Sequence, residues 1–290
     1  MSDSASTEDR SYDDLYEEFE SPLMRQLRLE AYGIDIGQHS WVTVKELRED
    51  IPRLELSPAS RLLDLGCGPC GPLAFIVGLV RCQGIGMDVS AKAMTAARTR
   101  AASLGIDDLL ELHEADLNEA MPFQSGSFDV VMSLDAILHL RDRLAVFREV
   151  ARVLRPRGRF YFTDAGVITG PISNEEIRLR AAHGYTQFTP SGSNERTLER
   201  AGFQLIDRND RTSSLLENAT GRLAARLAHR EEVEQVEGKT PFERQQRYLE
   251  TIAELSHRGA LSRMMYLAES RAMSSPSLLH DLAAVTPTRS

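Results

Sequence analysis

The densest group of residues that could do chemistry is LLDLGCGPCG, at residues 62–71. Its cysteines, Cys67 and Cys70, have the C-x-x-C spacing of a redox site, a chemistry that needs an exposed and activated thiolate. Its glycines match G-x-G-x-x-G, the pattern that brings a dinucleotide pyrophosphate to a helix N-terminus, and the acidic Asp88 follows at a suitable spacing. A plain turn between a strand and a helix, without any ligand, would contain the same residues. The segment alone leaves these interpretations open.

A third chemistry is suggested by Asp64, the acid two positions before the first glycine. With this acid, the segment resembles motif I of the class I S-adenosylmethionine-dependent methyltransferases. That cofactor carries an ammonium, a carboxylate and a sulfonium but no phosphate. Small residues would let its amino-acid portion approach the backbone closely, and a nearby acid would suit its ammonium. The resemblance implies that the segment binds the cofactor through Asp64, Gly66, Cys67 and Gly68.

Further matches to the same family follow in order along the chain. Asp88 closes the second expected strand in GIGMDVS, where a carboxylate can accept both ribose hydroxyls. Asp116, in HEADLNEAMPF, is placed where the family uses an acid to bind the adenine amino group. The strand FDVV at 128–131 and the turn LRPRG at 154–158 complete the family's usual order. The resemblance adds these residues to the expected cofactor site: Asp88, Val89, Asp116, Leu117 and Ser133.

The candidate for acid–base chemistry is His139, in SLDAILHL at 133–140, directly after the fourth expected strand. Residues Asp135 to His139 resemble, letter for letter, the D-A-I-L-H segment of the phosphoethanolamine and glycine/sarcosine N-methyltransferase families, within a resemblance that spans about residues 30–165. In those families the histidine faces the acceptor, which implies that His139 is a general base or positions the substrate. Asp135 is expected to belong to the same catalytic group.

Two physical observations support His139 independently of the resemblance. A histidine with a pKa near ~6.5 accepts a proton at neutral pH. The residue also stands where an open α/β sheet binds ligands, at the carboxyl end of a central strand. The alternative is that His139 only caps a loop between core residues.

The loop YGIDIGQHSW at 32–41 resembles the segment that these families place over the cofactor, although its middle, GQHS, departs from their tyrosine or histidine–glycine pattern. Gln38 or Ser40 is expected to contact the cofactor carboxylate, and His39 is expected to face the acceptor. Trp41, the single tryptophan, is expected to be an apolar anchor.

The N-terminal segment combines a possible cofactor contact with most of the protein's charge. In the relatives an N-terminal tyrosine folds over the cofactor, and the positional candidates here are Tyr16 and then Tyr12. Residues 1–20 carry eight acidic side chains and one arginine, a local net charge of −7 out of −9 for the whole chain. An acidic lid would suit a positively charged cofactor, and solvated disorder is the simpler alternative.

Alternating strands and helices must position these residues, and such alternation predicts a parallel sheet with helices on both faces. The expected strands are 61–65, 83–88, 110–114, 128–133, 159–163, 203–208 and 261–269. The expected helices are 12–32 (divided at Pro22), 43–49, 72–80, 91–104, 144–154, 174–182, 196–201, 215–236 and 242–257. The predicted fold is α/β: a doubly wound, mostly parallel, seven-stranded sheet with the Rossmann-like methyltransferase fold. N-terminal lid helices and a helical C-terminal cap insertion complete it.

The chain divides accordingly into five expected parts. These are an acidic tail with the lid helices (1–52), the cofactor-binding core (53–170), a helical cap and substrate region (171–260), the last sheet strand (261–270) and a loose tail (271–290). The cap supplies these possible acceptor contacts: Arg178, Arg180, His183, Tyr185 and Phe188.

The composition excludes several classes of protein. The chain of 290 residues has 42% hydrophobic and 27% charged residues, which is ordinary for a globular protein. It contains no membrane-length apolar run and no basic, apolar secretory leader. Three cysteines favour a reducing compartment over a disulfide framework, so a cytoplasmic protein is expected. No clustered basic excess indicates a nucleic-acid partner, and the seven histidines show no metal-ligand spacing.

Together these observations predict an enzyme that transfers a methyl group from S-adenosylmethionine to a small-molecule acceptor, as a monomer or homodimer. An amine nitrogen, for example of an amino acid derivative, is the first expected acceptor, because a histidine base can remove the proton of an ammonium group. An oxygen or carbon acceptor is the alternative within the class. A NAD-dependent oxidoreductase and a catalytically inactive binding module are the alternatives outside it.

Overall fold

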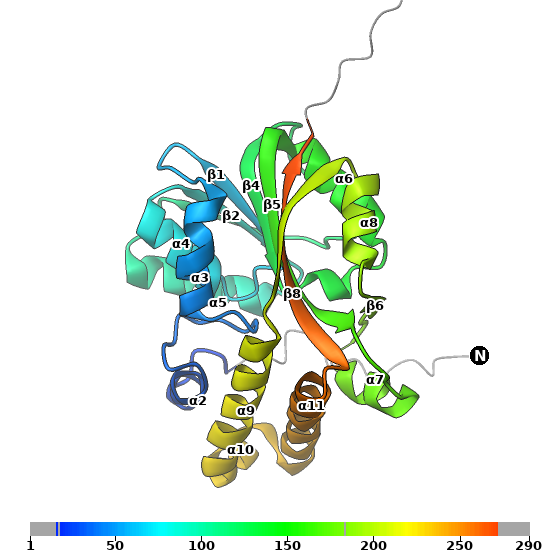
Figure 1. The fold of residues 1–290 in the computed structure, drawn as a ribbon. Coiled ribbons are helices and arrows are strands. Elements are labelled where there is room, and N and C mark those ends of the chain that lie inside the picture. The colour runs from blue at the N-terminus through cyan, green and yellow to red at the C-terminus, as the bar shows by residue number, and fades with distance from the viewer. Residues whose placement is uncertain (1–15, 17, 183, 272–290) are drawn as a thin grey trace, which may run out of the picture.

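The structure is a computed structural model that describes residues 16, 18–182 and 184–271 (Figure 1). Its sheet has the strand order β3-β2-β1-β4-β5-β8-β7, and the two-residue β6 pairs with the end of β5. The strands are β1 (Arg61–Leu65), β2 (Gln83–Asp88), β3 (Leu110–Glu114), β4 (Phe128–Leu134), β5 (Leu154–Ile168), β6 (Thr189–Pro190), β7 (Phe203–Asp210) and β8 (Leu261–Ser270). The first five pair in parallel, whereas β8 runs antiparallel to both of its neighbours, β5 and β7. The predicted seven strands are confirmed, and β6 is an addition.

Consecutive apolar side chains of a strand point to opposite faces of the sheet, so both faces are buried. Leu62 and Val130 contribute to a core on one face, and their neighbours Leu63 and Val131 contribute to a core on the other. The first face is covered by α3 (Val44–Asp50), α4 (Gly71–Val80) and α5 (Ala91–Leu104), and the second by α6 (Arg143–Val153) and α8 (Ser193–Arg200). The predicted doubly wound arrangement is therefore confirmed.

Another group of helices gathers at the end of the sheet where the parallel strands finish (Figure 1). These helices are α2 (Pro22–Tyr32), α7 (Asn174–Arg180), α9 (Thr212–Ala228), α10 (Arg230–Glu237) and α11 (Lys239–His257). Leu215 of α9 and Leu249 of α11 share a small core with Trp41. None of the helices in the described part of the chain is long and apolar enough to span a membrane.

The structure differs from the sequence-based expectations in three elements. The arginine-rich segment 155–158, predicted as a helix-to-strand loop, belongs to β5, which continues through an irregular register opposite β4. Arg157 accommodates this irregularity with φ +66°. The helix predicted over 215–236 is two helices that meet at His229. The predicted loose tail lies outside the described residues except for its first residue. Of the helix predicted before Pro22, residues 12–15 and 17 also lie outside the described residues, and residues 18–21 form a turn instead of a helix.

Candidate functional site

The glycine turn between β1 and α4 presents bare backbone at the edge of the sheet. Gly66 and Gly68 have φ values of +71° and +52°, in the left-handed region that glycine adopts at little cost. A Cβ atom on Gly66 would lie 2.5 Å from the Cβ of Ala136, so a side chain has no room there. The N–H of Gly66 donates to the carbonyl oxygen of Met87 over 2.8 Å, which fixes the turn against β2.

The N-terminal segment covers this turn. A Cβ atom on Gly71, the first residue of α4, would lie 2.4 Å from the carbonyl carbon of Gly37, so the loop over 33–41 packs directly on the helix start. The hydroxyl of Tyr16 lies 3.3 Å from Nδ1 of His39. It also stands 3.1 Å from where a Cβ of Gly68 would be. Tyr16 is thus placed over the glycine turn.

The two cysteines of the turn do not have the properties of a redox site. Cys67 and Cys70 are both free and buried. Their Sγ atoms pack against Gly86, where an added Cβ atom would lie 2.8 Å from Sγ of Cys67 and 3.0 Å from Sγ of Cys70. Burial, followed by the contact with Cys70, raises the pKa of the Cys67 thiol well above its ordinary value. A redox dithiol needs the opposite, an exposed thiolate with a lowered pKa.

Three acids stand at the ends of successive strands. Asp64 is 2% exposed and its Oδ1 has no hydrogen-bond partner among the described residues. Burial, with a smaller contribution from Asp88, raises the pKa of Asp64 well above its ordinary value. The carboxylate of Asp88 accepts hydrogen bonds from the backbone N–H groups of Gly68 (2.8 Å) and Ser90 (3.0 Å). Asp116 is exposed and bonds to its neighbour Asn118.

The orphaned oxygen of Asp64 is the strongest electrostatic feature at this end of the site. A buried carboxylate without a partner is costly, and a bound cation would relieve that cost. An ammonium group beside bare glycine backbone is therefore well accommodated here. No cluster of three His, Cys, Asp or Glu side chains in the described ranges is arranged to hold a metal ion.

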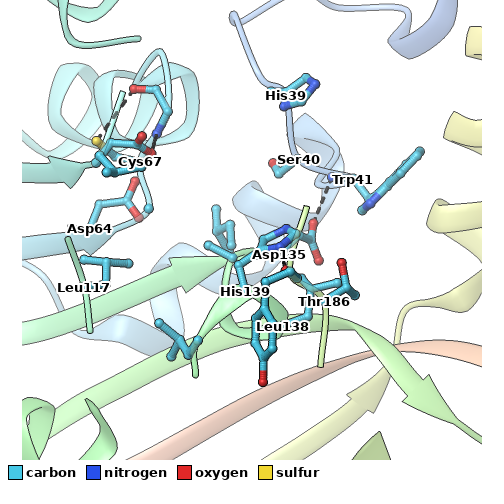
Figure 2. A pocket seen from close by; sticks show the side chains of 18 of the residues that line it. His39, Ser40, Trp41, Asp64, Cys67, Leu117, Asp135, Leu138, His139 and Thr186 are labelled. Carbon is cyan, nitrogen blue, oxygen red and sulfur yellow. Dashed lines mark hydrogen bonds between the residues drawn. The ribbon is translucent and has the colours of Figure 1, made fainter. Parts of the chain in front are cut away.

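A cavity of about 340 Å³ opens beside these acids and continues to His139 (Figure 2). Its lining includes most of the predicted site residues: Tyr16, Asp64, Gly66, Cys67, Gly68, Asp88, Val89, Asp116, Leu117, Asp135 and His139. In Figure 2, Asp64, Cys67 and Leu117 lie at one end of the cavity, and Asp135, His139 and Thr186 lie farther along it. His39, Ser40 and Trp41 approach from the N-terminal loop.

Two predicted cofactor contacts, Gln38 and Ser133, do not line this cavity. Ser133 is fully buried in β4, and its hydroxyl donates to the carbonyl oxygen of Leu65 over 2.8 Å. Gln38 is buried, and its amide closes its own loop by accepting from the N–H of Ile36 and donating to the carbonyl of Ile34. Both side chains are used by hydrogen bonds that shape the local backbone.

His139 ends a short 3₁₀ turn, Ile137–His139, that follows β4. Its Nδ1 lies 2.8 Å from the carbonyl oxygen of Tyr185. A carbonyl only accepts, so Nδ1 carries the proton and Nε2 carries the lone pair of the neutral ring. Burial lowers the pKa of His139, the Tyr185 carbonyl opposes this to a lesser degree, and the charge of Arg180 lowers the pKa further. The ring is therefore a neutral base at pH 7.

Asp135 lines the cavity, but its carboxylate is occupied by structural contacts. Oδ1 accepts from the hydroxyl of Thr163 and from Nε of Arg263, each over 2.8 Å. Oδ2 accepts from the backbone N–H of Trp41, also over 2.8 Å. Arg263 is fully buried and also contacts both carboxylate oxygens of Glu46 over 3.0 Å. Through these contacts Asp135 holds the N-terminal loop against the last strand of the sheet.

The far end of the cavity is formed by the N-terminal loop, the segment that follows α7, and the helices α7, α9 and α11. Its main residues, beyond those predicted for the motifs, are Trp41, Arg180, Tyr185, Thr186, Arg222, Gln245 and Tyr248. Two of the predicted cap contacts, Arg180 and Tyr185, are among them. Of the others, Arg178 is exposed outside the lining, Phe188 packs in a separate core and His183 lies outside the described residues.

Arg180 is the unusual residue of this end. It is 3% exposed, and it donates to the hydroxyl of Tyr248 (3.1 Å) and the carbonyl of Ala165 (3.3 Å). Its Nε has no partner, and no carboxylate in the described part of the chain forms an ion pair with it. Such a buried cation favours an anion in the cavity.

Comparisons with known proteins show which proteins this chain resembles. Residues 63–162 match the family described as "Methyltransferase domain". The sarcosine/dimethylglycine N-methyltransferase of Halorhodospira halochloris is 34% identical over 185 residues, which cover 61% of this chain and 63% of that protein. The 27-O-demethylrifamycin SV methyltransferase of Amycolatopsis mediterranei is 36% identical over 122 residues, 42% of this chain and 44% of that protein.

A solved structure extends the likeness to most of the fold. Phosphoethanolamine N-methyltransferase 2 of Haemonchus contortus, solved with phosphomonomethylethanolamine and S-adenosylhomocysteine, superposes with a TM-score of 0.75 at 18% identity. The superposition covers 90% of this chain and 60% of that one. The chain spans between 33% and 63% of the length of eight curated relatives that it matches.

Proposed function

We infer, from the methyltransferase domain that residues 63–162 form and from the class I methyltransferase fold around it, that this protein is an S-adenosylmethionine-dependent methyltransferase acting on a small molecule. One observation carries the proposal: a single cavity joins the glycine turn and its orphaned acid, Asp64, to the neutral imidazole of His139. Ligand-binding crevices of open α/β sheets lie at this end of the strands.

The cofactor end fits the parts of S-adenosylmethionine. Asp64 would pair with the ammonium, because its free oxygen is buried beside bare glycine backbone. Asp88 would accept ribose hydroxyls, and Asp116 would accept from the adenine amino group, because both line the cavity. When bound, this cofactor supplies a methyl group on a positively charged sulfur, which is already activated for displacement.

The chain's own part in the reaction is to deliver a deprotonated acceptor in line with that methyl group. An amine acceptor enters largely as an ammonium ion, which has no lone pair to donate. Nε2 of His139 takes this proton, so that the nitrogen lone pair is exposed, and the imidazolium later returns the proton to solvent. The Tyr185 carbonyl holds the ring in the required tautomer. Trp41, Tyr248 and the lid helices enclose the reacting groups, which favours loss of charge from the ammonium.

The buried cation of Arg180 favours an acceptor that carries an anionic group. A carboxylate or phosphate on the acceptor would pair with the buried guanidinium, whose Nε is still without a partner. An amine that also carries an acid, such as an amino acid derivative, satisfies both His139 and Arg180. Oxygen and carbon acceptors remain the alternative, since relatives include an enzyme named for O-methylation.

Two measurements test the proposal. Calorimetry should show binding of S-adenosylhomocysteine and none of NAD, whereas NAD binding alone would support the oxidoreductase alternative. A panel of amines, phenols and carboxylates supplied with S-adenosylmethionine should then give a product heavier by one methyl group. Cofactor binding with no product from any class would identify a catalytically inactive binding module.

A further inference from the structure

A second cavity, of about 270 Å³, adjoins the first beneath the lid helices. His39, Arg222 and Gln245 line both cavities, so these three side chains stand at the junction. The second cavity lies between α2 on one side and α9, α10 and α11 on the other, the helices grouped together in Figure 1. The fold thus encloses more space than the cofactor end and His139 account for.

Three separate segments lead from one cavity to the other in sequence order. On α11, Tyr248 lines the first cavity, Gln245 lines both and Pro241 lines the second. These positions are separated by three and four residues, so they share one face of the helix. On α9, Arg222 lines both cavities and Arg226, one turn later, lines only the second.

The N-terminal loop repeats this arrangement on the third side. Trp41 lines the first cavity, His39 lines both and Gln38 lines the second. Because all three segments line both cavities, the two cavities adjoin at His39, Arg222 and Gln245, and movement of these side chains would join them as two compartments of one space. This also assigns a place to Gln38, which sequence analysis had expected at the cofactor.

The second compartment has an apolar part in its wall. Its apolar lining residues are Phe19, Met24, Leu27, Val236 and Pro241. Two of its arginines are neutralised within the protein. Arg28 contacts both oxygens of Asp35 over 2.9 and 3.1 Å, and Arg226 contacts both oxygens of Glu237 over 3.0 and 2.7 Å. The charges of these two arginines are therefore already paired. The other polar residues of the lining are Glu18, Tyr32, Gln38, His39, Arg222 and Gln245.

We infer that the second compartment binds an apolar body of the acceptor, so that the substrate is an elongated, amphipathic molecule. Its methylated atom lies at His139, and its apolar chain passes Gln245 and Arg222 into the space beneath α2. This inference rests on the proposed function for the identity of the reacting end. It goes beyond that function because it separates long apolar acceptors from small hydrophilic ones.

A homologous series of probes measures the effect directly. Straight-chain α-amino acids, from glycine through 2-aminobutanoate and norleucine to 2-aminooctanoate, are titrated by calorimetry into the full chain saturated with S-adenosylhomocysteine. If the alkyl chain enters the second compartment, affinity rises about two- to fourfold for each added methylene. Equal affinity along the series, or no binding by any member, overturns the inference.

Two substitutions locate the effect. Val236 is 50% exposed and lines only the second cavity, so Val236→Trp can fill that cavity from its rim without burying a new core side chain. We expect this variant to lose the dependence on chain length. Leu227→Trp is the matched control, because Leu227 is 60% exposed on α9 and lines neither cavity. An unchanged dependence in Val236→Trp contradicts the inference.

The same series separates this inference from the proposed function. Affinity that rises with chain length but yields no methylated product leaves the second compartment in place and removes the enzyme activity. Methylated product together with equal affinity along the series supports the enzyme activity and overturns the inference about the second compartment.

Discussion

Nδ1 of His139 lies 2.8 Å from the backbone carbonyl oxygen of Tyr185. This contact joins the end of β4 to the segment that follows α7, so the wall of the acceptor site also orients the base. Because the carbonyl fixes the proton on Nδ1, Nε2 is left to accept a proton. The tautomer is thus set by the fold before any acceptor binds.

The first prediction concerns the base itself. His139→Asn keeps an N–H donor near the position of Nδ1 but has no titratable base. Turnover should fall about 10²- to 10⁴-fold, the usual contribution of general-base catalysis. Affinity for S-adenosylhomocysteine, measured by calorimetry, should stay within about twofold, because His139 is remote from the cofactor acids. Turnover equal to that of the unmodified protein would remove His139 from the mechanism.

The pH dependence of activity follows from the environment of His139. Burial and the charge of Arg180 lower the pKa of His139, so kcat/KM should decline on the acid side with a midpoint below 6.5. Arg180→Met removes the nearby positive charge and should move this midpoint to higher pH. It should also raise KM for acidic acceptors. The exposed Arg178 is on the same helix outside the cavity, so Arg178→Met should leave the profile unchanged.

The same shift has a consequence for stability with a defined sign. The folded-state pKa of His139 is lower than that of the unfolded chain, so the unfolded state binds the proton more tightly. The contribution of this group is fully present above the unfolded pKa of ~6.5 and is lost as pH falls through the folded value. In urea unfolding, the unmodified protein should therefore lose stability relative to His139→Asn, and only below neutral pH. A difference that grows above pH 7 would contradict the assignment.

Asp64 should lower the stability of the ligand-free protein and raise its affinity for the cofactor. Its folded-state pKa is raised, so the ligand-free protein is favoured below the unfolded pKa of ~3.9 and loses that contribution as pH rises through the raised value. At neutral pH, Asp64→Asn removes the negative charge of a buried carboxylate that has no hydrogen-bond partner at Oδ1. The free energy of unfolding should therefore rise by about 1–3 kcal/mol. Affinity for S-adenosylhomocysteine should fall at least about tenfold, since the ammonium loses its counter-charge.

The control for Asp64 is Asp116→Asn. Asp116 is exposed, and in the described contacts its carboxylate accepts hydrogen bonds only from Asn118, so the effect of this substitution on stability should be small. Measured by urea unfolding, a loss of stability in Asp64→Asn would show that the carboxylate has a protein partner after all.

The residues that the sequence predicts well are those whose function is set locally. Asp64, Asp88 and His139 each follow or end a strand with strong apolar patterning, so the motif and the element that carries it are contiguous. Their convergence follows from one rule, that parallel strands bring their carboxyl ends to the same edge of a sheet. Spacing along the chain was therefore enough to bring them into one predicted site.

The acceptor end could not be predicted in this way. Arg222, Gln245 and Tyr248 lie on long amphipathic helices, where the same periodicity describes a cap core and a ligand-facing wall. Whether a helix face meets protein or a cavity depends on how helices pack, and no local pattern encodes that. Asp135 shows the same limit. Its motif indicated a catalytic group, but its partner Arg263 is 128 residues away on the last strand.

The last prediction tests the buried cluster around Arg263. This fully buried guanidinium compensates Asp135 and Glu46, and Asp135 in turn accepts from the backbone of Trp41. Arg263→Met leaves two buried carboxylates without their cation and should lower the free energy of unfolding by about 3–5 kcal/mol. Adding Asp135→Asn removes one of these charges without new backbone strain, because asparagine tolerates the φ of +58° found there.

The double variant should therefore be more stable than Arg263→Met alone by at least about 1 kcal/mol. With Asp135→Asn as the remaining corner, the double-mutant cycle gives the coupling energy as the change in the double variant minus the changes in both single variants. Arg157→Met is the matched control, since the Arg157 side chain is 79% exposed and its contact with Glu269 is a surface ion pair. Simple addition of the two losses in the double variant would contradict direct coupling. Because Asp135 also holds the loop that carries His39 and Trp41, Arg263→Met should raise KM for the acceptor even under conditions where the variant is fully folded.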